Sequence, residues 1–199
     1  MEDVVLIVSD DRLRVEADLA AGRLLCPRCR AGVLGGWGCS RLRWLRTREG
    51  ERRLRPRRGR CRESACGATH VLLPDVCLAG RQTEVEVIGE ALLSVEGYRP
   101  VAERLGVPAE TVRDWRQRFR SRAEEIAAHF LWWARAFDGS LDPPVPAGSL
   151  VADALEAIGV CARVASLVLG RRGPWSWVSA LTAGGLLLIN ANPPWPAPE

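Results

Sequence analysis

Apolar and polar positions change their spacing twice along the chain, and the first change follows a short N-terminal segment. Residues 4–8 form a run of apolar, mostly β-branched side chains, which predicts a strand. A helix is expected next, with Ser9 as its N-cap and Gly22 just beyond its end. One face of that helix would be made by Leu13, Ala17 and Ala20.

Between residues 23 and 76 the pattern is that of short strands. The stretch 41–44 alternates arginine with large apolar residues, which is the period-two spacing of a strand. The sequence Arg-Glu-Gly-Glu at 48–51 favours a turn between two strands, and residues 70–73 are expected to form a last strand that Pro74 ends. We therefore expect a small β unit over residues 23–76.

From residue 83 the apolar spacing becomes helical, with Val85, Ile88, Leu92 and Val95 on one stripe and Gly97 at its end. Further helices are expected at 100–105, 108–122, 123–137 and 150–169, the third of these as a new helix or as a continuation of the second. The pattern predicts an α+β fold. The chain would begin with an N-terminal strand and helix (1–22), followed by the β unit (23–76) and a helical unit (80–137). A Pro/Gly-rich linker (138–149) would then lead to apolar C-terminal helices with a Pro-rich tail (150–199).

Positive charge is concentrated in the β unit. All 28 basic residues are arginines and the formal net charge is +4, but fourteen arginines fall within 23–62, where only Glu49 and Glu51 oppose them. The absence of lysine indicates a GC-rich genome, which favours arginine codons. The choice of arginine therefore says little about function, whereas the positions of the arginines are informative. A local basic stripe is typical of a surface that faces phosphates, although a solvated strand edge that resists aggregation also fits. On the first interpretation Arg41, Arg43, Arg57 and Arg58 would contact nucleic acid.

The cysteines of the β unit have the spacing of metal ligands. Cys26 and Cys29 form a CxxC pair, and Cys61 and Cys66 form a second pair with four intervening residues. Two such pairs around a hairpin predict a zinc ribbon, in which four thiolates complete a closed, structural Zn²⁺ site. The alternatives are buried free thiols, or His70 in place of one thiolate. The remaining cysteines are expected to be small buried residues: Cys39, Cys77 and Cys161.

Residues 100–115 carry the signature of a helix-turn-helix. Ala102 is small where two helices must cross, Gly106 permits a left-handed turn, and Pro108 suits the first turn of the following helix. Val112, Trp115 and Phe119 would face the core. The opposite face and its flanks would contact duplex DNA in the major groove and along the phosphates, through Ala109, Glu110, Arg113, Arg116, Gln117, Arg118 and Arg120. An ordinary helical hairpin without a ligand is the alternative.

The run LGVPAETVRDWRQRF resembles the helix-turn-helix of bacterial insertion-sequence transposases. Together with CPRC and RCRESACGATHVLLP, it resembles an uncharacterised family of actinobacterial transposase-like proteins with an N-terminal zinc ribbon. The resemblance covers roughly residues 20–137. It implies DNA binding and a zinc site held by Cys26, Cys29, Cys61 and Cys66, but no activity. The chain departs from the pattern in the longer spacing of its second cysteine pair.

Three functional hypotheses follow, none of them enzymatic. A transposase holds two metal ions with three carboxylates on a mixed sheet, and the 62 residues after Phe137 have no strand-rich segment for such a site. We expect a cytoplasmic, nucleoid-associated DNA-binding regulator or transposon accessory protein, since the N-terminus carries no secretory signal. Alternatively, the zinc ribbon and the C-terminal helices dock on a transposase or on a second copy of the chain, or the apolar segment 173–192 tethers the protein to a membrane.

Overall fold

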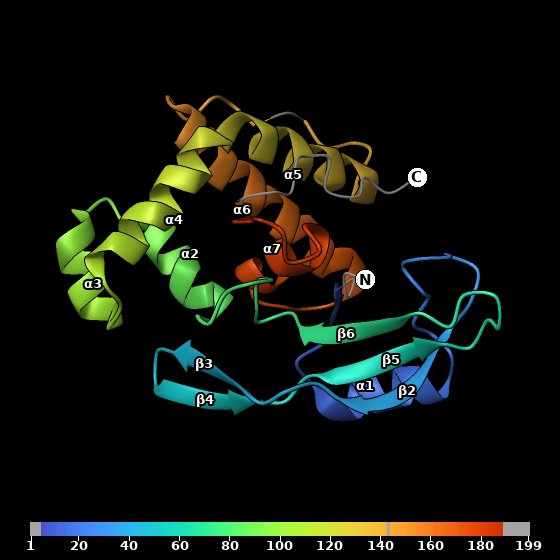
Figure 1. Ribbon diagram of the computed structural model, residues 1–199. Helices are drawn as coiled ribbons and strands as arrows, with labels where there is room; N and C mark the ends of the chain where they lie inside the picture. The colour runs from blue at the N-terminus through green and yellow to red at the C-terminus, as the bar shows by residue number, and fades with distance from the viewer. Residues whose placement is uncertain (1–4, 143, 189–199) are drawn as a thin grey trace.

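The computed structural model describes residues 5–142 and 144–188 (Figure 1). In that part of the chain all strands precede α2, so the fold is α+β as expected. The elements in order are β1 (Val5–Val8), α1 (Arg12–Ala20), β2 (Leu34–Cys39), β3 (Arg43–Thr47), β4 (Gly50–Leu54), β5 (Arg57–Cys61), β6 (Thr69–Pro74), α2 (Val85–Leu93), α3 (Tyr98–Leu105), α4 (Ala109–Ser121), α5 (Ala123–Phe137), α6 (Leu150–Leu169) and α7 (Pro174–Leu181).

The main sheet joins the N-terminus to the β unit. Its strand order is β1-β6-β5-β2, with β1 parallel to β6 and β5 antiparallel to both of its neighbours. Val5 lies opposite Val71, and Leu34 lies opposite Cys61. The N-terminal strand is therefore an edge of the same sheet that carries the cysteines, and not a separate segment before it.

Helix α1 covers one face of this sheet with a different stripe from the one the sequence suggested. Val15 and Leu19 are buried, whereas Leu13 is 81% exposed. The N-cap is also later than expected. The carboxylate of Asp11 accepts the backbone N–H of Leu13 at 2.9 Å, while Ser9 only accepts the N–H of Asp11. Both expectations were wrong: Asp11 is the cap, and the expected face of Leu13, Ala17 and Ala20 is exposed, because Val15 and Leu19 are the side chains that pack in the core of the sheet.

Strands β3 and β4 form a separate two-stranded hairpin that is attached to the helical region (Figure 1). The turn lies where the sequence predicted it, with Thr47 opposite Gly50. The backbone N–H of Arg46 donates to the carbonyl oxygen of Gln82 at 2.8 Å, and the carbonyl of Arg46 accepts from the N–H of Glu84 at 2.8 Å. The hairpin is thus held against the segment that leads into α2.

One hydrophobic core unites α2 to α7, including the linker-separated C-terminal helices. Helix α6 has the predicted bounds, and α5 begins as a new helix after a break at Arg122. The stripe expected over 85–95 stops early, because α2 ends at Leu93 and Ser94 is extended. Val95 is therefore fully exposed, and Gly97 is the N-cap of α3 rather than the end of α2.

The apolar C-terminal segment belongs to this core as far as it is described. Trp175 and Trp177 are 5% and 4% exposed, and Leu186 and Leu187 are 1% exposed. Gly89 allows this packing, since a Cβ at that position would overlap the indole of Trp175. The described face is thus core and not an exposed dimer surface, while the proline-rich tail lies outside the described residues. Within the described residues, no helix is both long and apolar enough to cross a membrane.

Candidate metal centre and helix-turn-helix surface

The two cysteine pairs meet at one end of the main sheet. Cys26 and Cys29 lie in the loop between α1 and β2, Cys61 ends β5, and Cys66 lies in the loop that leads to β6. Their four Sγ atoms all lie within 4.8 Å of one another, and two of the four residues are buried. The long second pair closes because the backbone N–H groups of Cys66 and Gly67 both donate to the carbonyl oxygen of Glu63. The cluster predicted from the sequence is therefore formed.

The sulfur spacing fits a tetrahedral metal site. Cys26 Sγ lies 3.8 Å from Cys66 Sγ, and Cys29 Sγ lies 3.7 Å from Cys61 Sγ. Four sulfurs on a tetrahedron with bonds of about 2.3 Å to a central ion would be separated by about 3.8 Å along each edge. A disulfide requires only about 2.0 Å, so these pairs are not disulfides. The donor set is that of zinc or of an iron–sulfur centre.

The surroundings shift the pKa values of Cys29 and Cys61 in opposite directions. The backbone N–H of Gly32, 3.4 Å from the Cys29 sulfur, is the main cause that lowers the pKa of Cys29 to about 6, because it stabilises the thiolate. Burial raises the pKa of Cys61 to about 12. A bound cation would oppose the raised pKa of Cys61, since it favours the thiolate form of every ligand.

His70 contacts the cluster without joining it. Its ring is 1% exposed and its Nε2 lies 3.3 Å from the Sγ of Cys26, but the group of mutually close ligand atoms contains only the four cysteines. With a proton on Nε2, the imidazole would donate to the sulfur, which is the usual role of a polar neighbour of a metal ligand. Of the other cysteines, Cys77 and Cys161 are buried as expected, whereas Cys39 is only half-buried.

The helix-turn-helix is formed by α3 and α4. Gly106 is left-handed, with a φ of 62°, and the backbone N–H of Val107 donates to the carbonyl oxygen of Ala102 at 3.0 Å. Val107 is buried in the corner between the helices. The face of α4 that was expected to be internal is 0 to 1% exposed and consists of Val112, Trp115 and Phe119.

The opposite side of α4 is open to solvent. Glu110, Arg113, Gln117 and Arg120 are exposed and follow one another at intervals of three or four residues; they are called here the outer face of α4. Ala109, which the sequence analysis placed on this face, is half-buried and packs against the helical core. No other described segment covers this outer face.

Arg116 has a structural role that sequence reasoning missed. Its guanidinium donates to the carbonyl oxygens of Ala91, Ser94 and Glu96 at 2.7 to 2.8 Å. These carbonyls lie at and beyond the C-terminal end of α2, where helical partners are missing. Because the side chain is committed to them, we assign Arg116 to holding α4 against α2 rather than to phosphate contact. Nothing in the local sequence distinguished it from its arginine neighbours.

The other predicted contact residues divide into paired and unpaired groups. Arg118 is paired with Asp114 at 2.7 Å, Arg57 with Glu16 at 2.6 Å, and Arg58 donates to the Thr69 hydroxyl at 3.0 Å. Arg41 and Arg43 are exposed, and in the described part of the chain they form no ion pair.

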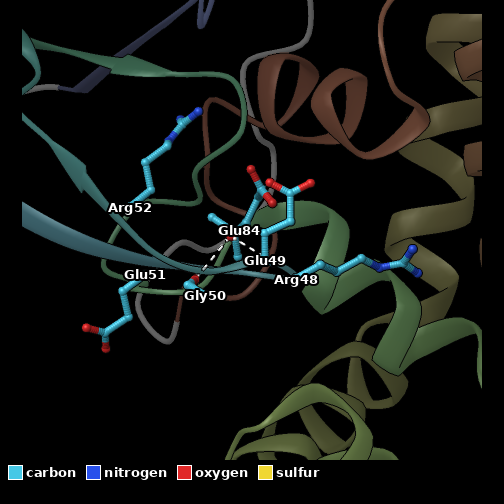
Figure 2. Close-up of a pocket in the computed structure, with 7 residues that line it drawn as sticks. Arg48, Glu49, Gly50, Glu51, Arg52 and Glu84 are labelled. Atoms are coloured by element: carbon cyan, nitrogen blue, oxygen red, sulfur yellow. Dashed lines mark hydrogen bonds between the residues drawn. The ribbon is translucent and has the colours of Figure 1, made fainter.

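A cavity of about 460 Å³ lies at the hairpin turn (Figure 2). Figure 2 shows the carboxylates of Glu49 and Glu84 directed to the same side, with Arg48 and Arg52 extending away from each other. Both arginines have partners outside the cavity: Arg48 Nε donates to Glu90 at 2.8 Å, and Arg52 to Asp10 at 2.8 Å. The lining contains neither histidine nor cysteine. We read this cavity as a solvated gap between ion pairs.

A scan against protein-family models finds no match for the chain. Searches of curated proteins and of solved structures find none either.

Proposed function

We propose that the protein is a sequence-preferring DNA-binding protein with a structural zinc site and no catalytic centre. It would act as a transcriptional regulator or as an accessory protein of a transposon. The observation that carries this proposal is the solvent-exposed polar face of α4, presented by a helix-turn-helix whose inner face is fully packed. Because surface helices commonly expose a polar face, the proposal also depends on the turn at Gly106 and Val107, which packs α4 against α3 with this face outward, as DNA recognition by this motif requires.

The outer face of α4 has the chemistry of direct base readout. In this motif the second helix enters the major groove with its N-terminal part foremost. Arg113 would pair with guanine and Gln117 with adenine, because their side chains match those base edges bidentately. Arg120, one turn further on, would contact a phosphate. Glu110 would disfavour indiscriminate binding, since a carboxylate near DNA is unfavourable unless it meets a cytosine amino group.

Zinc is the metal that we propose for the four-cysteine cluster. All four positions are cysteines, so the site is closed and leaves no coordination position for a reaction. Once bound, the ion would rigidify the loop that precedes β2 and the loop that follows β5, because its ligands lie in them. The small core of this sheet, which includes Val8, Leu34 and Leu72, gives limited stability by itself.

The absence of catalysis is part of the proposal. Two of the acidic residues after α5 support turns: Asp138 accepts the N–H of Ser140 at 3.0 Å, and Asp153 accepts the N–H of Ala147 at 2.6 Å. Carboxylates in this role are poorly placed to share metal ions for phosphoryl transfer.

Duplex binding by the outer face can be tested by titrating a labelled mixed-sequence duplex with the full, metal-loaded chain at two salt concentrations. The expected result is salt-sensitive binding that weakens when Arg113→Ala and Gln117→Ala are combined. Arg163→Ala is the control, since it removes an exposed arginine from α6. Lack of duplex binding by the wild-type chain would contradict the proposal and favour docking on a protein partner or self-association.

A further inference from the structure

Two tryptophans of the β unit are exposed, in contrast to those of the helical core. Trp37 on β2 and Trp44 on β3 are 53% and 47% exposed, while Trp115 and Trp175 are at most 5% exposed. Trp37 lies between Gly36 and Gly38 on an edge strand, so neither chain neighbour shields its ring with a side chain. Each indole therefore presents part of a flat apolar surface on which a planar ligand group can stack.

Each of these rings carries an arginine. The guanidinium of Arg60 lies 4.6 Å from the ring centre of Trp37, and that of Arg53 lies 4.8 Å from the ring centre of Trp44. Arg53 is the direct cross-strand neighbour of Trp44 in the hairpin. The stacked cation holds each indole in a defined orientation and places a positive charge beside it.

The charge around these pairs is not neutralised within the described chain. Residues 23–62 hold fourteen arginines and two glutamates, a net charge of +12. Several of the arginines are paired with or bonded to other residues, among them Arg23, Arg48, Arg52, Arg57 and Arg58. In contrast, several exposed arginines form no ion pair with a described carboxylate: Arg41, Arg43, Arg53, Arg55, Arg60 and Arg62. A strongly negative ligand is the complement of this surface.

We propose that the β unit has a second binding site, for single-stranded DNA, in which bases stack on Trp37 and Trp44 and phosphates pair with the arginines around them. Flat aromatic rings interleaved with positive charge are the combination that binds unpaired strands, because every base presents a stacking face once it leaves the duplex. A duplex hides those faces, and an acidic protein segment has no equivalent for them. The site is distinct from the outer face of α4 and goes beyond the proposed duplex binding.

The test compares two ligands on the same full, metal-loaded protein. A labelled oligothymidylate of roughly 15 nucleotides serves as the single strand, a mixed-sequence duplex of the same length serves as the second ligand, and fluorescence anisotropy reports binding. Trp37→Ala and Trp44→Ala are each expected to weaken single-strand binding by about tenfold while leaving duplex binding within about twofold. Arg60→Lys keeps the charge but loses the planar stacking group, so a smaller loss is expected.

Trp132→Ala is the matched control, because Trp132 is 44% exposed but lies on α5, outside the β unit. Metal content and the thermal transition of each variant establish that the β unit is folded. Equal single-strand affinity of Trp37→Ala, Trp44→Ala and Trp132→Ala would overturn this inference. Duplex binding without single-strand binding by the wild-type chain would also overturn it and leave the proposed function standing. Single-strand binding that is weakened by Trp37→Ala and Trp44→Ala but not by Trp132→Ala would confirm it, whatever the outcome for the duplex.

Discussion

The guanidinium Nε of Arg116 in α4 donates to the carbonyl oxygen of Ala91 in α2 at 2.8 Å. Two further bonds from the same side chain reach Ser94 and Glu96, so a single arginine satisfies three carbonyls where α2 ends. The relationship joins α2, the helix that precedes the motif, to α4, the helix that would enter the groove. It therefore sets the angle at which the outer face of α4 is presented.

Replacement of Arg116 is expected to affect stability first. Arg116→Ala leaves two partly buried carbonyls and one exposed carbonyl without this donor, so the free energy of unfolding should fall by about 2 kcal/mol. Arg120→Ala on the exposed side of the same helix should change it by less than about 0.5 kcal/mol. Urea unfolding followed by circular dichroism measures both values. Equal values for the two variants would show that the Arg116 bonds contribute no net stability.

The metal site makes a prediction about stoichiometry. The purified protein is expected to contain about one metal ion per chain, and Cys26→Ser or Cys66→Ser should reduce this to near zero, because three thiolates no longer close a tetrahedral shell. Cys39→Ser is the control, since Cys39 is half-buried outside the cluster. Elemental analysis by mass spectrometry provides the measurement. If the Cys39 and Cys26 variants retained the same amount of metal, the cluster would not be a metal site.

The turn of the helix-turn-helix can be tested at Gly106. Its φ of 62° is strained for any residue with a Cβ, although open space surrounds the position. Gly106→Ala should therefore lower the free energy of unfolding by about 1 kcal/mol through backbone strain alone. Gly139→Ala also adds a Cβ in open space, but without a left-handed φ, and is expected to be neutral. A neutral Gly106→Ala would mean that the turn relaxes away from the described geometry.

The half-buried histidine of α5, His129, gives a pH prediction. Burial lowers the pKa of His129 below its ordinary value of 6.5, and its Nε2 lies 3.0 Å from the carbonyl oxygen of Leu181. As the pH falls below about 6.5, the unfolded chain takes up this proton before the folded chain does, so stability is lost on acidification. Between about pH 7.5 and 5.5 the wild-type protein should lose more stability than His129→Gln, whose amide can still donate to Leu181. Parallel pH profiles in urea unfolding would exclude this contribution. The metal centre cancels in the comparison because both proteins contain it.

The strongest sequence signals were local ones. The apolar period over 150–169 and the corner formed by Gly106 and Val107 were predicted correctly, because a helix and a tight turn depend on residues close to one another in the chain. The meeting of the two cysteine pairs was also foreseen, since a metal site forces its ligands together whatever the intervening loop length. The identity of the metal and the DNA contacts stay predictions.

The predictions that were wrong or missing concern contacts between residues that are distant from one another in the chain. The pairing of β1 with β6 joins residues more than sixty positions apart, and nothing in the 4–8 run specifies its neighbour. Leu13 was expected on the buried face because it is apolar, but the sheet packs against Val15 and Leu19, and the sequence of the helix alone does not specify which side meets the sheet. Arg116 looked like any other arginine of α4. Its role became visible only once the end of α2 was placed beside it.

The claim that the outer face of α4 reads duplex sequence is tested most directly by selecting bound duplexes from a random library, with the wild-type protein and with Arg113→Ala in parallel. The account predicts an enriched motif for the wild-type protein and loss of preference at one guanine position for Arg113→Ala, with the rest of the motif unchanged. No enrichment by the wild-type protein, or an identical motif from both proteins, would contradict it.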